Sequence, residues 1–281
     1  MEISKNINEV RSIIKGWKLQ GFKVGFVPTM GYLHEGHQSL IKRAAEENDR
    51  VVVSIFVNPM QFGPTEDLSS YPRDLERDCM VCSDGGANLI FNPEAKEMYF
   101  EDFYSFVDMD ILTEELCGKS RPIHFRGVCT VVTKLFNIIT PDRAYFGQKD
   151  AQQLAVIKRM VRDLNMDIDI VGCPIVREED GLAKSSRNTY LNPKERKAAT
   201  ILNRSLNIAR KAIENGESNS NRVINIIIEN IDKEPLAKID YVDVVDLLSM
   251  KKVDRLEESV LVAIAVYIGK TRLIDNFIYE I

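Results

Sequence analysis

The stretch Lys23–Val57, KVGFVPTMGYLHEGHQSLIKRAAEENDRVVVSIFV, contains two apolar runs with a helical pattern between them. Lys23–Val27 is a short strand-like run that a proline and a glycine interrupt, and Arg50–Val57 is a nearly continuous β-branched run. The apolar residues between these runs recur on one stripe of a helix that ends near Glu47. A continuous β-branched run is typical of a parallel strand covered on both faces. The stretch therefore predicts a strand–helix–strand unit.

The same alternation continues to about residue 175. Helices are predicted near Pro72–Ser83, Val128–Ile139 and Asp150–Leu164, and strands at Asn88–Phe91, Arg143–Phe146 and Asp167–Val171. Repeated units of this kind imply right-handed crossovers and a doubly wound parallel sheet, Rossmann-like in class. Such sheets bind ligands beyond the carboxyl ends of their strands.

The pattern changes after Pro174. A long helix from about Pro193 to Asn215 and a second helix at Arg222–Ile231 precede three strands in succession, which are predicted at Ile239–Asp246, Val260–Ile268 and Leu273–Tyr279. A run of strands after a run of crossovers predicts a smaller α+β domain. We therefore expect an α/β domain over residues 1–175 and an α+β domain over residues 176–281.

The composition excludes several classes of protein. With 281 residues, 44% of them hydrophobic, the chain is neither disordered nor collagen-like. Its 42 acidic and 37 basic residues give a net charge of −5, which offers no general attraction for nucleic acid or anionic lipid. We expect a cytoplasmic protein without a membrane span, because no stretch approaches the roughly 20 apolar residues that a span requires.

The five cysteines also fit a reducing compartment, since their number is odd and the chain is long. Cys79 and Cys82 form a C-x-x-C, but neither a second pair nor a nearby histidine completes a zinc set. We therefore expect two cysteines on a helix.

Two histidines, His34 and His37, lie between the first predicted strand and the following helix, in PTMGYLHEGH. Gly31 and Gly36 allow the sharp turn that this position needs, and a helix N-terminus offers free N–H groups to an anion. Two imidazoles three residues apart can add donors to a phosphate. The alternative is that His37 is a core residue, because it shares a helix face with Leu40. The paired histidines and the flanking glycines favour the phosphate site.

Three further segments are candidates for ligand binding. Gly147–Asp150 (GQKD) ends a strand and offers a lysine to phosphate, although it is also an ordinary helix start. Gln152 and Gln153 follow it and could bind a polar small molecule. The segment Lys184–Asn188 (KSSRN) could close over a triphosphate or be a solvated loop. NPMQFG, from Asn58, follows a buried strand but is also a turn signal.

Taken together, these segments resemble the pantothenate synthetase (pantoate–β-alanine ligase) family, over nearly the whole chain. PTMGYLHEGH, IFVNPMQFG, the YPR at Tyr71–Arg73, HFRGV at His124–Val128, YFGQKDAQQ and GLAKSSRN occur in the family's order and approximate spacing. The family belongs to the nucleotidyltransferases related to class I aminoacyl-tRNA synthetases. HEGH and KSSR look like the two phosphate-handling signatures of that superfamily.

The resemblance implies a set of site residues. His37 and His34 would be catalytic, together with Lys149, Ser185, Ser186 and Arg187. ATP would contact Met30, Gly31, Tyr32, Leu33, His34, Glu35, Gly36, His37, Gly147, Gln148, Lys149, Asp150, Val176, Lys184, Ser185, Ser186 and Arg187. Pantoate would contact Gln61 and Gln153, with Gln61 also near β-alanine and with Asn58 and Tyr71 as neighbours. Asp78 would be a carboxylate associated with Mg²⁺. The family usually has Met in place of Lys184, so this lysine either strengthens phosphate binding or points to solvent.

The reaction implied is an ATP-dependent condensation of pantoate with β-alanine that passes through pantoyl adenylate and releases AMP and pyrophosphate. The second domain would be a lid, and the protein would be a homodimer. Two other functions stay open at this point: a plain nucleotidyltransferase, and a nucleotide-binding sensor or scaffold. The paired glutamines and the complete motif order favour the ligase.

Overall fold

The computed structural model describes residues 1–64 and 66–280 and divides the chain into two compact units. The first unit comprises Met1–Met109, Arg121–Gln148 and Val156–Pro174. The second comprises Asp110–Ser120, Lys149–Ala155 and the residues from Ile175 onward. The second unit therefore includes two short segments that precede residue 175. The functional division into residues 1–175 and 176–281 stays a prediction.

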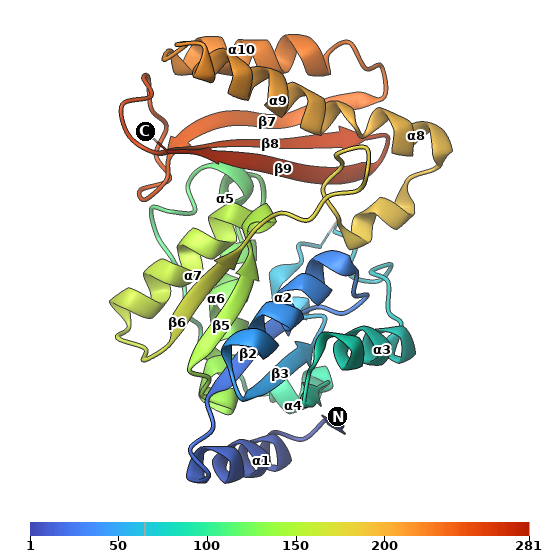
Figure 1. Cartoon of the computed structure of the whole chain (residues 1–281), viewed down its shortest axis with the longest axis vertical. Coiled ribbons are helices and arrows are strands. Elements are labelled where there is room, and N and C mark those ends of the chain that lie inside the picture. The colour runs from blue at the N-terminus through green and yellow to red at the C-terminus, as the bar shows by residue number, and fades with distance from the viewer. Residues whose placement is uncertain (65, 281) are drawn as a thin grey trace. The chain divides into compact units, whose positions relative to one another are not determined.

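The first unit contains a six-stranded sheet, β1-β4-β3-β2-β5-β6, in which every neighbouring pair is parallel (Figure 1). The strands are β1 (Glu2–Ser4), β2 (Val24–Thr29), β3 (Arg50–Ile55), β4 (Leu89–Phe91), β5 (Arg143–Gly147) and β6 (Asp169–Cys173). The chain proceeds in one direction from β2 through β3 to β4 and then crosses to β5 on the other side of β2. This reversal is the topological switch point, where doubly wound sheets bind ligands. The predicted α/β fold is confirmed.

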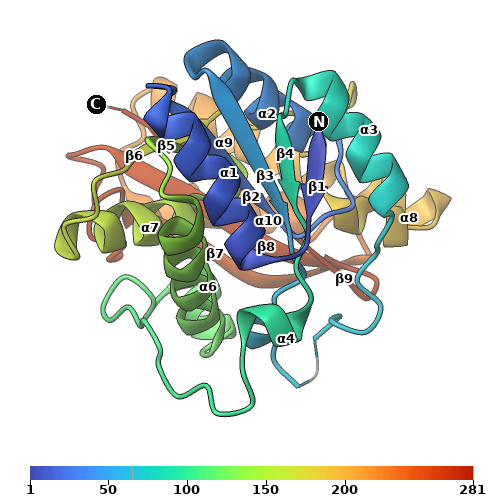
Figure 2. The ribbon, with the colours of Figure 1, turned by 90° about the horizontal axis from the view of Figure 1, so that it is seen from below.

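Helices cover both faces of this sheet. They are α1 (Ile7–Leu19), α2 (Glu35–Glu47), α3 (Leu75–Gly85), the short α4 (Ala95–Met98), α6 (His124–Ile139) and α7 (Ala151–Asp163), which continues from the second unit. Figure 2 shows α2 beside α3, and α1 beside α6. Successive residues of β2 pack against helices on opposite faces of the sheet. Val27 belongs to the hydrophobic core that contains Ile41 of α2. The ring of Phe26 contacts that of Phe136 of α6.

The second unit contains a three-stranded antiparallel sheet, β7-β8-β9. Its strands are β7 (Ala237–Asp246), β8 (Val260–Ile268) and β9 (Thr271–Tyr279), and its helices are α5 (Leu116–Ser120), α8 (Pro193–Ala198), α9 (Ile201–Glu214) and α10 (Ser220–Ile231). Figure 1 shows α9 and α10 beside this sheet. Their apolar residues form one core with it. The smaller α+β region is confirmed.

The prediction of one long helix from Pro193 to Asn215 is wrong in one respect, because the structure has two helices, α8 and α9, with a break between them. The hydroxyl of Thr200 donates to the carbonyl of Lys197 at 2.9 Å, and the Thr200 N–H reaches the same carbonyl at 3.4 Å. This three-residue spacing is tighter than an α-turn and ends the regular helix.

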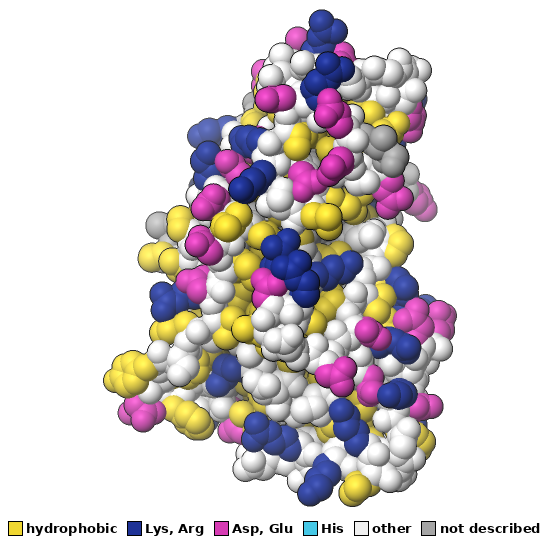
Figure 3. All heavy atoms as spheres, turned by 90° about the vertical axis from the view of Figure 1, so that its left-hand side faces the viewer, with side chains coloured by type: hydrophobic (Ala, Val, Ile, Leu, Met, Phe, Trp, Pro, Cys, Tyr) yellow, Lys and Arg dark blue, Asp and Glu magenta, His cyan; other side chains and the backbone are white. Residues whose placement is uncertain are grey.

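Other expectations concern the cysteines and the surface. All five cysteines are free, and Cys79 and Cys82 both lie on α3, as predicted. Within the described residues, no helix is long and apolar enough to cross a membrane. Figure 3 shows acidic and basic side chains intermixed on the face that it draws.

Candidate active site

The loop between β2 and α2 contains the first predicted phosphate site and needs a glycine at its turn. Gly31 has a φ of +82°, and a Cβ atom there would lie 2.9 Å from Oδ2 of Asp78 and 3.0 Å from Cγ2 of Ile55. Tyr32 also has a positive φ, of 51°. The loop therefore passes very close to α3, where Asp78 lies, and only glycine permits this approach.

Asp78 holds this loop in place. Its carboxylate is 1% exposed and accepts from the Tyr32 N–H at 2.9 Å and from the Leu33 N–H at 2.6 Å, one bond to each oxygen. Burial raises the pKa of Asp78 above its ordinary value, although the two N–H donors oppose this effect. Each oxygen keeps a further lone pair, but the carboxylate is almost completely buried and already holds the loop through two main-chain N–H groups. No group of three or more His, Cys, Asp or Glu residues among those described could hold a metal ion. The association of Asp78 with Mg²⁺ stays a prediction.

We expect Asp78→Asn to loosen this loop and lower the stability of the fold. The new amide has one acceptor oxygen and would turn an NH2 group toward a main-chain N–H. A buried donor left unpaired costs about 1–3 kcal/mol, which denaturant unfolding can measure. Asp84→Asn is the matched control, because Asp84 lies exposed on the same helix. If Asp78→Asn leaves stability unchanged but raises the Mg²⁺ concentration needed for half-maximal activity, the metal role is supported instead.

His34 and His37 lie at the start of α2 with their rings together, 4.1 Å apart at their centroids. Nδ1 of His34 accepts from the Gly36 N–H at 3.1 Å, and Nδ1 of His37 accepts from the His34 N–H at 3.3 Å. A neutral imidazole that accepts at Nδ1 carries its proton on Nε2. Each ring therefore presents an Nε2–H donor at the positive end of a 13-residue helix. This arrangement suits an anion.

Gln61 and Met30 lie together in the first unit. Nε2 of Gln61 lies 3.0 Å from Sδ of Met30, and its Oε1 accepts from Nδ2 of Asn58 at 3.2 Å. Tyr71 is buried against the ring of Phe62, the residue that follows Gln61. The two residues proposed for pantoate belong to different units, Gln61 to the first and Gln153 to the second.

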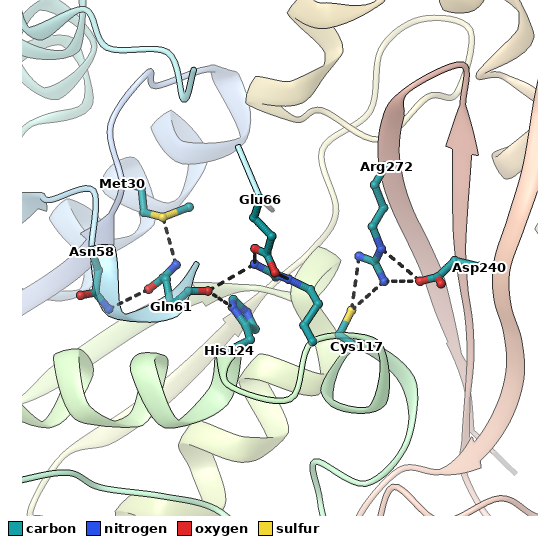
Figure 4. A network of polar contacts seen from close by, with 9 residues as sticks. Met30, Asn58, Gln61, Glu66, Cys117, His124, Asp240 and Arg272 are labelled. Carbon is teal, nitrogen blue, oxygen red and sulfur yellow. Dashed lines mark hydrogen bonds and ion pairs between the residues drawn. The ribbon is translucent and has the colours of Figure 1, made fainter. Parts of the chain in front are cut away.

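Sequence reasoning missed how the main chain of Gln61 is held. Nδ1 of His124 lies 3.0 Å from the Gln61 carbonyl oxygen, and Nη2 of Arg121 lies 3.4 Å from it. Arg121 is itself paired with Glu66, whose Oε1 lies 2.9 Å from Nε of the arginine (Figure 4). His124 was part of a recognised motif, but nothing in the sequence indicated its partner.

The GQKD segment forms a 3₁₀ turn, Gln148–Asp150, after Gly147. Gly147 and Gln148 belong to the first unit, and Lys149 and Asp150 belong to the second. Nζ of Lys149 lies 3.2 Å from a carboxylate oxygen of Asp150. The suggestion that Gln152 binds a small molecule is wrong, because its amide is used by the protein. Its Nε2 donates to the carbonyls of Leu112 and Glu115 at 2.9 and 2.8 Å, and its Oε1 accepts from a main-chain N–H.

The other residues predicted to bind phosphate lie in the loop that follows β6. The Lys184 N–H donates to the Val176 carbonyl at 2.9 Å, and Ser185 caps the 3₁₀ helix Ser186–Tyr190. The Lys184 side chain is only 17% exposed and pairs with Glu178 at 2.8 Å. It therefore does not point to solvent, and its charge is partly compensated within the loop.

Two adjacent residues of β9, Asp275 and Asn276, contact Arg177, whose main chain bridges to Ala183 beside Lys184, and Lys149 of the GQKD segment. Asp275 is 2% exposed and forms a two-point ion pair with Arg177, at 2.7 and 2.9 Å. Asn276 is 5% exposed and donates from Nδ2 to the carbonyl of Lys149 at 2.8 Å. A single sequence contains no signal for these contacts. Asp275 lies 98 residues after Arg177 along the chain, and Asn276 lies 127 residues after Lys149.

Comparison with known proteins identifies the family. Residues 2–278 match the model of the pantoate–β-alanine ligase family. The chain is 69% identical to the pantothenate synthetase of Enterococcus faecalis and 66% identical to that of Clostridium acetobutylicum, in each case over the whole of both chains. A crystal structure of pantothenate synthetase from Thermus thermophilus superposes with a TM-score of 0.93 at 44% identity and covers 99% of both chains.

A further solved structure has ligands. It is the pantoate–β-alanine ligase of Francisella tularensis complexed with beta-gamma ATP and β-alanine, with a TM-score of 0.80 at 38% identity, covering 99% of this chain and 97% of that one. These matches agree over the full length of the sequence. The chain therefore belongs to the pantoate–β-alanine ligase family and is an enzyme that condenses pantoate with β-alanine.

Proposed function

We propose that the condensation consumes ATP and proceeds through pantoyl adenylate, with AMP and pyrophosphate as products. A carboxylate is a poor acyl donor, because its oxide cannot leave when an amine attacks. Transfer of AMP to pantoate converts that oxygen into part of a good leaving group. The amine of β-alanine then attacks the acyl carbon, the amide bond forms and AMP leaves. The protein's task in the first step is to align the carboxylate with the α-phosphate and to stabilise the charge that develops.

The observation that carries this proposal is the geometry of His34 and His37. Both rings accept main-chain N–H groups at Nδ1, so that the neutral imidazoles carry their protons on Nε2, at the N-terminus of α2. This terminus follows β2, at the switch point of the sheet, where nucleotide phosphates bind in folds of this class. The Francisella tularensis ligase, whose structure was determined with beta-gamma ATP and β-alanine, supports ATP as the co-substrate.

The remaining roles are assigned residue by residue. Lys149, Ser185, Ser186 and Arg187 would bind phosphate, Lys184 with Glu178 would support the same loop, and Gln61 and Gln153 would bind pantoate. Mg²⁺ would supply positive charge to the phosphates, but the described residues form no cluster for it and we assign it no ligand. We assign no base to the second step. A homodimer and a cytoplasmic location complete the proposal on the likeness to the family alone.

Isotope exchange tests the adenylate intermediate. In the presence of enzyme, Mg²⁺, ATP and pantoate, but without β-alanine, labelled pyrophosphate should appear in ATP, because the first step runs backwards. Omitting pantoate should abolish the exchange, because pantoate is the acceptor of AMP in this mechanism and no enzyme-bound adenylate is proposed. Exchange that persists without pantoate would mean that the enzyme itself accepts AMP. Rapid quenching of a single turnover provides the second readout and should trap the adenylate before β-alanine is added.

A further inference from the structure

The amide of Asn58 has only one possible orientation. Asn58 is 1% exposed and precedes the 3₁₀ turn Pro59–Gln61. Its Nδ2 lies 3.1 Å from the carbonyl oxygen of Gly127, which can only accept, and its Oδ1 lies 3.3 Å from the N–H of Met60, which can only donate. Exchanging the amide's oxygen and nitrogen would make both contacts repulsive. Two main-chain groups therefore determine which side of Asn58 is the donor.

The orientation of Asn58 determines that of Gln61. Because Nδ2 of Asn58 has only hydrogens to offer, the atom of Gln61 that faces it at 3.2 Å must be the acceptor Oε1. The NH2 group of Gln61 then points the other way, where it lies 3.0 Å from the thioether of Met30 (Figure 4). A thioether is a weak acceptor, so a substrate oxygen is a better partner for this group. The main chain of Gln61 is held at the same time by His124 and Arg121.

Tyr99 completes this chain of contacts. Its hydroxyl lies 2.8 Å from Oδ1 of Asn58, and since that oxygen can only accept, the tyrosine must donate. The Tyr99 ring packs edge-on against Phe103, and Nζ of Lys134 lies 5.5 Å from its centroid. Burial raises the pKa of Tyr99, so the hydroxyl keeps the proton that it donates.

We propose that Tyr99 and Asn58 are positioning residues, which set the Gln61 amide so that it meets the substrate only as a hydrogen-bond donor. The inference rests on the proposed function, which gives Gln61 its contact with pantoate. A donor-only amide pairs with a carboxylate, hydroxyl or carbonyl oxygen. It cannot accept a hydrogen bond from the ammonium form of β-alanine. Gln61 therefore binds oxygen atoms of its substrates.

The test measures the KM values for pantoate and ATP in a set of near-isosteric variants. Gln61→Ala should raise the pantoate KM about tenfold or more, with little change in the ATP KM. Gln61→Glu should raise it at least as much, because a carboxylate opposes a substrate oxygen. Asn58→Asp replaces the Nδ2 donor by an oxygen, so Gln61 should turn its NH2 group inward and the pantoate KM should rise by a similar factor. Tyr99→Phe should raise it about threefold to tenfold.

Two controls separate positioning from general damage. Tyr145→Phe removes another buried hydroxyl, which accepts from Nδ2 of Asn48 at 2.7 Å and donates to Glu47 at 2.8 Å, and it should leave the pantoate KM unchanged. In the Gln61→Ala background, Asn58→Asp and Tyr99→Phe should have no further effect on the pantoate KM.

Four outcomes would contradict the inference in whole or in part. Tyr99 does not position Gln61 if Tyr99→Phe changes the pantoate KM equally in the wild-type and Gln61→Ala backgrounds. The same holds if its effect on the pantoate KM equals that of Tyr145→Phe. Near-normal pantoate affinity in Gln61→Glu would show that Gln61 accepts from its substrate. An unchanged pantoate KM in Gln61→Ala would instead show that the assignment of Gln61 in the proposed function is wrong, and the inference would be lost with it.

Discussion

Replacing His37 by Ala should slow adenylate formation by about 10²–10³, the usual cost of removing one preorganised donor from a developing charge. The His37 ring has two separable functions in this structure. Its Nδ1 accepts the N–H of His34 and caps the helix, while its Nε2 presents the donor proposed for phosphate. The loss in rate should come from Nε2 and the loss in stability from Nδ1. Single-turnover quenching and thermal unfolding measure these two losses separately.

His37→Asn distinguishes the two functions. Its short amide can accept the His34 N–H from nearly the position of Nδ1, but it places no donor where Nε2 lies. It should therefore recover much of the stability lost in His37→Ala and none of the rate. If His37→Ala instead retains near-normal turnover and loses several kcal/mol of stability, His37 is a core histidine, and the site must lie elsewhere.

Lys149→Ala and Arg187→Ala should each raise the ATP concentration needed for half-maximal rate by about 10- to 100-fold, the range for losing a hydrogen bond to a charged group. Both side chains belong to the second unit. Asn276 of β9 donates to the carbonyl of Lys149, and Asp275 pairs with Arg177, ten residues before Arg187. Their combined effect should be smaller than the product of the two, because groups that stabilise one transition state act as a unit.

Charge-matched controls are available for both changes. Lys158 lies exposed on α7 and Arg204 lies exposed on α9. Lys158→Ala and Arg204→Ala remove the same charges from the surface and should leave the ATP requirement unaltered. If all four variants raise the ATP concentration for half-maximal rate equally, the net charge of the protein determines ATP binding, and Lys149 and Arg187 have no specific role.

The elements that sequence reasoning located well are those with strong local patterns. The β-branched run that became β3 could hardly form anything but a buried parallel strand. β1 has only three residues, too few for any periodicity, and its identity depends on pairing with β4, 87 positions later at Glu2 and Leu89. Helix α1 did have a local signal, since Asn6 caps it and Val10 and Ile14 share its buried face, but charged residues between them obscured it.

The residues of the candidate site also fall into those that a local pattern predicts and those that it does not. Motifs indicated which loops contain candidate binding and catalytic residues, because glycines, histidines and lysines at strand ends are visible in one sequence. The residues that hold those loops were not visible. The family resemblance gave Asp78 an association with Mg²⁺, but nothing local in the sequence indicates that its oxygens face main-chain N–H groups 45 and 46 residues earlier. Gln152 was named as a residue that could bind a small molecule, because a helical sequence does not show which carbonyls its amide meets.

The two adjacent residues on β9 have a consequence for the order of events during synthesis. Asp275 and Asn276 leave the ribosome 98 and 127 residues after the partners that they hold, Arg177 and Lys149. At about 5–20 residues per second, this separation corresponds to a delay of about 5 to 25 seconds. During this interval the two segments lack their anchors, even where the parallel sheet of the first unit has already formed. A nascent chain should therefore acquire its stable fold in the first unit before the segments of the second unit that are proposed for the nucleotide are anchored.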